Sequence, residues 1–218
     1  MKSYLSEFIG TALLLAIVAG SGYMGETLSS GNAAVALLGN SIATGAGLFV
    51  LITLLGPISG AHFNPVVTIL QWQLGHFEKH KVIPYLACQF CGAYVGILIT
   101  HLMFELPLIQ HSMKVRTGLG MWVSEFIATL ILLTTIYIGE KQSKEKLPML
   151  IALIVTAGYW FTSSTFFSNP AVALARVFTN TFVGISPNNV FGFVISEAFA
   201  LLFLVIVLSQ IKKNKTKI

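Results

Sequence analysis

Two segments decide the fold of this chain: Ser59-Gly60-Ala61-His62-Phe63-Asn64-Pro65-Val66 and Ser168-Asn169-Pro170-Ala171-Val172. Each contains an Asn-Pro pair. Proline at the first position of a helix loses no hydrogen bond, and its fixed φ starts the helix. Asparagine before it is a good N-cap, which the proline ring keeps out of the α region. The two pairs therefore predict short helices over residues 65–75 and 170–179.

The composition is that of a membrane protein. The chain has 218 residues, of which 55% are hydrophobic and only 10% charged, and its mean hydropathy is +0.81. A soluble domain carries about 25% charged residues, so a soluble enzyme, a disordered chain and a nucleic-acid binder are excluded despite a pI of 9.3. All eight acidic residues are glutamate, which excludes an aspartate-based metal cage. We expect no catalytic residues, cofactor, metal or nucleic-acid partner.

Uncharged stretches between clusters of charge predict the membrane spans. Two of them, 27–77 and 147–175, are too long for one crossing, and each contains an Asn-Pro pair. A helix of eleven or fewer residues cannot cross a bilayer of roughly 30 Å at 1.5 Å per residue, so each short helix must stop near the middle and return. We therefore expect an all-α membrane protein with six transmembrane helices and two re-entrant half-helices. The expected spans lie at about residues 8–25, 34–55, 82–104, 118–139, the first part of 147–175, and 189–211.

The positive charges predict the orientation. Of the thirteen Lys and Arg residues, only Lys114, Arg116 and Arg176 fall on one side of this arrangement. The positive-inside rule therefore places both termini in the cytoplasm of a multi-pass cell-membrane protein. The N-terminal stretch lacks a small-residue cleavage site and is interpreted as a first span, not a signal peptide. The ten residues on the cytoplasmic side are Lys2, Lys79, Lys81, Lys141, Lys144, Lys146, Lys212, Lys213, Lys215 and Lys217.

The chain repeats itself. Residues 6–15, SEFIGTALLL, and residues 124–133, SEFIATLILL, are identical at seven of ten positions. Residues 1–116 and 117–218 thus each hold three spans and one half-helix. Because three is odd, the second repeat enters the membrane from the opposite side. An inverted 3+3 repeat places its functional centre near the midplane, where the two breaks meet.

This geometry predicts a passive path for small neutral solutes. Each helix N-terminus carries roughly half a positive charge, so two of them facing one point repel cations and hydrated protons. The amides of Asn64 and Asn169 are expected to donate to a passing solute, and irregular backbone is tolerated at this depth only beside a water-filled cavity. The expected midplane residues are Asn64, Pro65, Val66, Asn169, Pro170 and Ala171, and the expected pore-lining loop residues are Gly60, Ala61 and His62.

These motifs resemble the aquaporin, or major intrinsic protein, family. The resemblance covers essentially the whole chain and also rests on the opening Glu-Phe-Ile-Gly-Thr at residues 7–11. It implies an aquaporin-like right-handed bundle, a pore in each protomer and a homotetramer. The first motif reads Asn-Pro-Val instead of Asn-Pro-Ala, which is a mild enlargement of the side chain beside the midplane. The chain looks most like the aquaglyceroporin-like or metalloid-facilitator-like bacterial members.

The selectivity filter departs from the family pattern. The resemblance implies filter positions at Thr44, Ala157, Phe166 and Val172, and the family's filter arginine is replaced by Val172. A wide, weakly polar constriction follows, suited to water, glycerol, urea and metalloid hydroxides. Arg176, one helical turn further on, has two alternatives. It either reaches back and refills the filter, which would make a strict water channel, or bonds loop carbonyls at the outer surface.

Glutamates inside the spans have a structural and a functional interpretation. Glu7 and Glu125 occupy equivalent positions in the repeats. Either they accept hydrogen bonds from the re-entrant backbone or they form a proton relay. Gln89 and Glu197 look like partners in the same role, and Glu197 is a candidate for a protonated side chain. An ion-coupled secondary transporter is the alternative function, but no acidic residue lies within ten positions of Asn64 or Asn169.

Overall fold

The computed structural model describes residues 1–215, and Lys217 of the basic tail lies outside the described residues. Every regular element in this range is helical. Single 3-10 turns at Lys144–Lys146 and Arg176–Phe178 extend the short helices α6 and α7. The α-helices are α1 Lys2–Leu28, α2 Ala33–Ser59, α3 Pro65–Gln73, α4 Lys79–Met103, α5 Leu119–Gln142, α6 Leu147–Phe161, α7 Pro170–Ala175 and α8 Pro187–Lys215.

The helices differ in length in a way that matters for the membrane. Five of them, α1, α2, α4, α5 and α8, are each long and apolar enough to cross a bilayer. Helix α6 has only 15 residues, and α3 and α7 are shorter still, with nine and six. The two short helices begin at Pro65 and Pro170 with asparagine N-caps, as the Asn-Pro pairs predict. Both end earlier than expected, because α3 stops at Gln73 and α7 continues only as a 3-10 turn.

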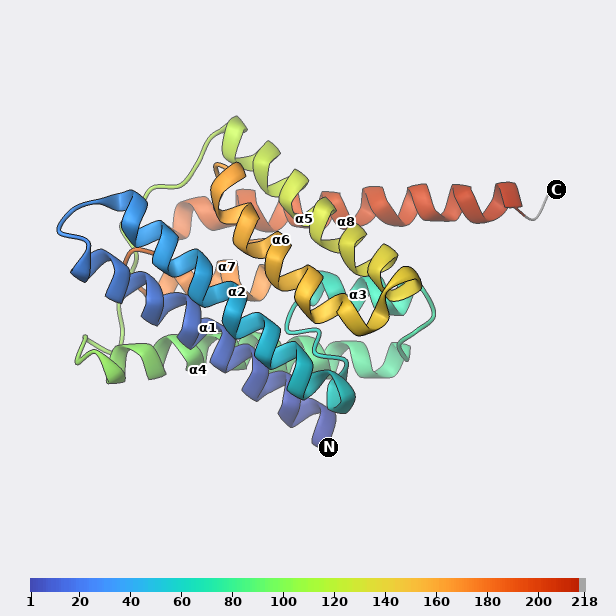
Figure 1. The fold of residues 1–218 in the computed structure, drawn as a ribbon, viewed down its shortest axis with the longest axis horizontal. Helices are drawn as coiled ribbons and strands as arrows, with labels where there is room; N and C mark the ends of the chain where they lie inside the picture. The colour runs from blue at the N-terminus through green and yellow to red at the C-terminus, as the bar shows by residue number, and fades with distance from the viewer. Residues whose placement is uncertain (216–218) are drawn as a thin grey trace.

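The long helices surround the two short ones. Helix α1 packs against α2 and α4, α2 packs against α6, and α5 packs against α6 and α8. Figure 1 shows α3 and α7 lying among the long helices, and the two are in contact. The close packing of α1 on α4 depends on Gly92 and Gly96, since a Cβ at these positions would overlap the backbone oxygens of Phe8 and Ala12.

The connections gather at two ends of the bundle. In Figure 1 the α3–α4 and α5–α6 connections and the end of α8 lie towards the right, while the α1–α2 and α4–α5 connections lie towards the left. Lys144 and Lys146 lie in the right-hand α5–α6 connection, and Lys79 begins α4 at the same end. Lys114 and Arg116 lie in the α4–α5 connection at the opposite end. The lysine-rich connections therefore share one end of the molecule.

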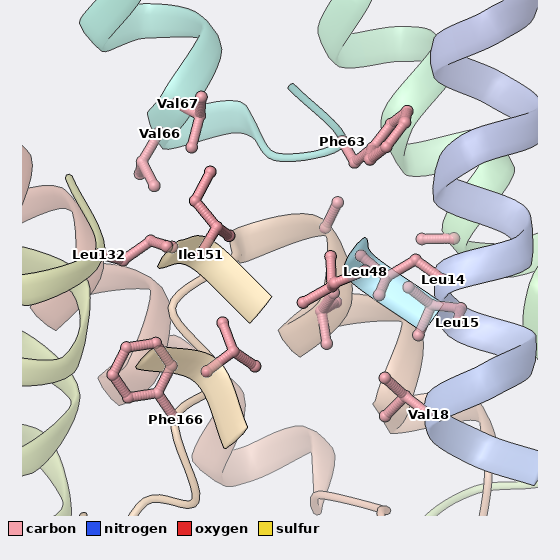
Figure 2. Close-up of a cluster of buried hydrophobic side chains, with 14 of the residues drawn as sticks. Leu14, Leu15, Val18, Leu48, Phe63, Val66, Val67, Leu132, Ile151 and Phe166 are labelled. Carbon is pink, nitrogen blue, oxygen red and sulfur yellow. The ribbon is translucent and has the colours of Figure 1, made fainter. Parts of the chain in front are cut away.

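An apolar core joins both halves of the chain. In Figure 2 side chains from α1, α2, α3, α5 and α6 turn toward one interior region, together with Phe63 and Phe166 from the loops before the short helices. Members such as Leu15, Leu133 and Ile97 are fully buried. The core therefore fixes both loops against the long helices.

Candidate functional site

The N-termini of the two short helices are bonded directly to each other. Asn64 Nδ2 donates to the backbone oxygen of Ser168 at 2.7 Å, and Asn169 Nδ2 donates to the backbone oxygen of Phe63 at 2.8 Å. The two side-chain oxygens accept from the first amides of their own helices. An asparagine amide has two N–H donors, so this reciprocal cross-link uses one of them on each residue. The sequence predicted amides facing a solute, but it did not predict this cross-link.

The loops before the two short helices have matching strained backbone. Ala61 and Phe63 have φ of 49° and 48°, and Phe166 and Ser168 have φ of 56° and 50°. Such left-handed conformations are uncommon for residues other than glycine and concentrate at functional sites. Glutamate side chains, described below, accept hydrogen bonds from amides of both loops.

A cavity of about 110 Å³ runs beside the cross-link. Its walls come from α1, α2, α3, α5, α6 and α7 and from both loops, and most of its surface is apolar. Of the residues expected at the site, the cavity is lined by Thr44, Gly60, Ala61, His62, Asn64, Phe166, Asn169, Val172 and Arg176. Pro65, Val66, Pro170 and Ala171 are buried at the helix starts and are not among the lining residues.

The assignment of Ala157 to the filter needs correction. Ala157 is exposed on the outer surface of α6, and the cavity is lined instead by Val155 and Tyr159. Residues four apart share a helix face, whereas a residue two positions away points to nearly the opposite side. Counting a fixed distance from the asparagine therefore selected the wrong face of α6.

Tyr159 is the functional candidate that the sequence interpretation missed. Its side chain is buried in the cavity wall, and its hydroxyl lies 3.2 Å from the hydroxyl of Thr44. The spacing of apolar residues at 151 and 155 on α6 continues to 159 and was a usable signal. Tyr159 and Thr44 together form a polar strip in the cavity.

Arg176 combines the two alternatives considered for it. Its Nε donates to the backbone oxygen of Val183, which is a loop-bonding role. The side chain is nevertheless only 3% exposed and lines the same cavity as Val172. Its guanidinium carbon lies 3.5 Å from the centroid of the Phe167 ring, a cation–π contact. The guanidinium of Arg176 therefore places a positive charge in the cavity one helical turn beyond Val172.

Arg116 supports this arrangement from outside the cavity. It donates from Nε to Gly184 O at 3.0 Å and from Nη2 to Phe182 O at 3.1 Å. Its guanidinium carbon also lies 5.7 Å from the Phe167 ring centroid. The carbonyls of residues 182–184 are thus held by two arginines, one of which lines the cavity.

The side chain of Glu7 on α1 accepts hydrogen bonds from the loop before α3. One carboxylate oxygen accepts from Ser59 Oγ at 2.8 Å and from the His62 amide at 2.9 Å. The other accepts from the Phe63 amide and from Gln89 Nε2, both at 2.8 Å. Glu7 is fully buried, and its two oxygens receive four donors.

Glu125 and Glu197 hold the second loop. Glu125 Oε1 accepts from the amide of Ser168, and Glu197 Oε1 accepts from the amide of Asn169 at 2.9 Å. Both carboxyls are fully buried. Glutamates from three long helices therefore contact the backbone of the two loops.

The fold and the cavity define a multi-pass helical membrane protein with an internal cavity beside the starts of two short helices. A model of the major intrinsic protein family matches residues 1–196, and the chain belongs to that family. The solved structure of the aquaglyceroporin from Plasmodium falciparum has the same fold, with a TM-score of 0.73 at 21% identity, over 96% of this chain and 97% of that one.

Two relatives extend this comparison. Aquaglyceroporin AqpS of Rhizobium meliloti (strain 1021) is 50% identical over 193 residues, which cover 88% of this chain and 82% of that protein. The probable glycerol uptake facilitator protein of Thermotoga maritima is 33% identical over 174 residues, covering 71% of this chain and 72% of that protein. Both similarities span most of the two chains compared.

Proposed function

We propose that this protein is a passive membrane channel for water and small neutral solutes such as glycerol, urea and metalloid hydroxides. The observation that carries the proposal is the cavity that runs beside the two cross-linked helix N-termini, with largely apolar walls and a few polar groups. The names of the relatives, an aquaglyceroporin and a glycerol uptake facilitator, support the same class of solute.

The proposed arrangement in the cell membrane has six crossings and two re-entrant half-helices. Helix α6 is the fifth crossing along the chain, shortened because the chain turns back toward α7, and α3 and α7 are the half-helices. Residues 1–116 and 117–218 are the two inverted repeats, both termini are cytoplasmic, and the channel is a homotetramer. The lysine-rich connections at one end of the bundle support this orientation.

Ion exclusion follows from fixed charge along the path. Two helix N-termini meet at the asparagine pair, each with roughly half a positive charge, and Arg176 adds a full charge further along the cavity. The remaining N–H of each asparagine amide donates to a water oxygen, which orients that water and interrupts a chain of proton-donating waters. Cations and protons are therefore rejected while neutral solutes pass.

The proposed filter consists of Thr44, Tyr159, Phe166, Val172 and Arg176. Thr44 and Tyr159 supply hydroxyls, Arg176 supplies a charged donor, and Phe166 and Val172 supply apolar walls. The valine leaves space at the place where the family resemblance expects an arginine. Because Arg176 also lines the cavity, a strict water channel is the alternative to be separated by experiment.

Stopped-flow light scattering on proteoliposomes tests the function. Wild-type vesicles are expected to equilibrate water, glycerol and urea faster than empty vesicles, without accumulating solute against a gradient. Rapid water flux with no glycerol or urea flux would select the strict water channel. Accumulation driven by a proton or sodium gradient would instead establish a coupled transporter.

Replacing Arg176 by methionine is expected to open the filter to cations. At an effective dielectric constant of about 20, two unit charges 4 Å apart interact by roughly 4 kcal/mol, so cation leakage should rise by at least about tenfold, since 1.36 kcal/mol corresponds to a factor of ten. Glycerol flux should rise as well. The matched control is Lys114→Met, which removes an exposed lysine paired with Glu26 at 3.3 Å. Equal cation leakage in the two variants would contradict this role.

Replacing Gly158 by valine is expected to narrow the cavity from outside it. A Cβ at this position would overlap the ring of Phe166, so the ring must move toward the cavity that it lines. Overpacking of this kind costs about 1–3 kcal/mol, and glycerol flux should fall about tenfold while water flux falls less. Gly39→Val is the control, because nothing lies within 4 Å of its added Cβ. Unchanged glycerol flux in Gly158→Val would show that Phe166 does not set the width.

A further inference from the structure

We propose that Glu125 and Glu197 bind one proton between them, and that this proton-sharing pair positions Asn169 for its role in the path. The proton is a bound ligand of a buried site behind α7, separate from the filter. Its presence is argued from the hydrogen-bond pattern and burial of the two carboxyls, while its effect on flux rests on the proposed function.

In the first half of the molecule the corresponding carboxylate, Glu7, has all its hydrogen bonds made. Glu7 receives two donors on each carboxylate oxygen, and one of the four is the side-chain amide of Gln89 on α4. Gln89 is fully buried. An ionised carboxylate only accepts hydrogen bonds, and an amide N–H donates. A carboxylate and a glutamine therefore fit each other with no bound proton.

The second half replaces that glutamine by a second carboxyl. Glu125 and Glu197 come from α5 and α8, which pack together, and their side chains are within hydrogen-bonding reach of each other. Each uses Oε1 to accept a loop amide, and each has a buried Oε2 that meets no donor among the described residues. Two ionised carboxyls have no hydrogen to place between them. One added proton supplies the donor that Gln89 supplies in the first half.

The surrounding charges leave room for one negative charge on the pair. Arg176 interacts electrostatically with Glu125, but less strongly than with Arg116, and its own Nε is bonded to Val183 O. This guanidinium therefore offsets at most one negative charge on the pair. The other elements packed here, α3, α7 and the loop 162–169, contain no acidic, basic or histidine side chain, and α6 contributes Tyr159 as its one titratable group. The loop carries the hydroxyls of Thr162, Ser163, Ser164, Thr165 and Ser168. A second buried negative charge would be uncompensated and strongly unfavourable.

The shared proton keeps the start of α7 in place. Glu197 accepts the amide of Asn169, whose side chain is bonded to Phe63 O. Loss of the proton would leave two like charges side by side, and their repulsion would separate the two carboxyls. Because Glu197 is bonded to Asn169, that separation displaces the asparagine from the cross-link. Flux is therefore expected to fall at alkaline pH when the proton is removed.

Infrared spectroscopy of the reconstituted wild-type protein tests the proton directly. A protonated carboxyl has a C=O stretch above the amide I band, which an ionised carboxylate lacks. We expect this band at pH 7 in the wild type and its loss in both Glu125→Gln and Glu197→Gln. The control Glu26→Gln changes a partly exposed glutamate and should leave the band intact. The converse variant Gln89→Glu places a second carboxyl beside Glu7 and should add a second band.

The flux readout uses the conservative and the disruptive change at one position. Glu197→Gln keeps an oxygen for the Asn169 amide and should abolish the fall in water flux at alkaline pH. Glu197→Leu leaves that amide without an acceptor, so flux should fall about tenfold at every pH. The proposal would be overturned by a wild-type spectrum without the protonated band at pH 7. It would also be overturned if exchanging sodium for choline at constant ionic strength changed stability, because the pair would then hold a metal cation. If the wild-type protein shows the protonated-carboxyl band but conducts no solute, the proposed function is wrong and the proton-binding site remains supported.

Discussion

Replacement of Glu7 by leucine is expected to prevent stable folding of the chain in the membrane. The carboxylate receives the Ser59 hydroxyl, the amides of His62 and Phe63, and the Gln89 side chain. A buried donor left without a partner costs about 1–3 kcal/mol, and four are lost together. Since native proteins are stable by only about 5–15 kcal/mol, this one change removes much or all of the folding free energy.

The measurement is the yield and the thermal unfolding of detergent-purified protein. Glu26→Leu is the matched control, because it also removes one negative charge from α1 but at a partly exposed position. Glu7→Gln keeps one acceptor oxygen and should fall between the two. A Glu7→Leu protein that unfolds at the wild-type temperature would show that the loop is held by other contacts.

Replacement of Val172 by arginine is expected to reduce glycerol flux by more than tenfold and water flux by less. Val172 lines the cavity, and Arg176 lines it one turn further along, about 5.4 Å away. A guanidinium in place of the isopropyl group fills part of the cavity that Phe166 also lines. It also adds a second positive charge near Arg176, and the two repel each other. Because glycerol is larger than water, the reduced space lowers glycerol flux more than water flux.

The control for this variant is Val172→Met, which lengthens the side chain without a charge. A fall in glycerol flux shared by both variants would assign the effect to width, and a fall confined to the arginine variant would assign it to charge. Undiminished glycerol flux in Val172→Arg would show that residue 172 does not face the path. Both variants are measured in the same proteoliposome assay as the wild type.

Local chemistry made several features predictable. The Asn-Pro pairs predicted where α3 and α7 begin, because proline fixes the first turn and asparagine caps it within the same few residues. The low charge predicted a helical membrane protein, since a bilayer admits few other backbones. The repeated Ser-Glu-Phe-Ile segment singled out Glu7 and Glu125, and both contact the re-entrant loops.

The filter was less predictable because it depends on helix rotation. A register difference of two residues on α6 turned Ala157 to the outer surface and Tyr159 to the cavity. Counting along the chain from the asparagine cannot detect this difference, because the loop between α6 and α7 has its own length and shape. The apolar period along α6 was the better guide.

The sequence by itself determined the membrane class, the two helix starts and the glutamates behind them, since each follows from the chemistry of a few adjacent residues. Only the tertiary structure decided that the two asparagines bond across to the opposite loops, that Arg176 both holds Val183 and lines the cavity, and that Glu197 faces Glu125. These contacts join residues from different helices. Their distances are fixed by how the helices pack, and they cannot be predicted from the residues that are adjacent in the sequence.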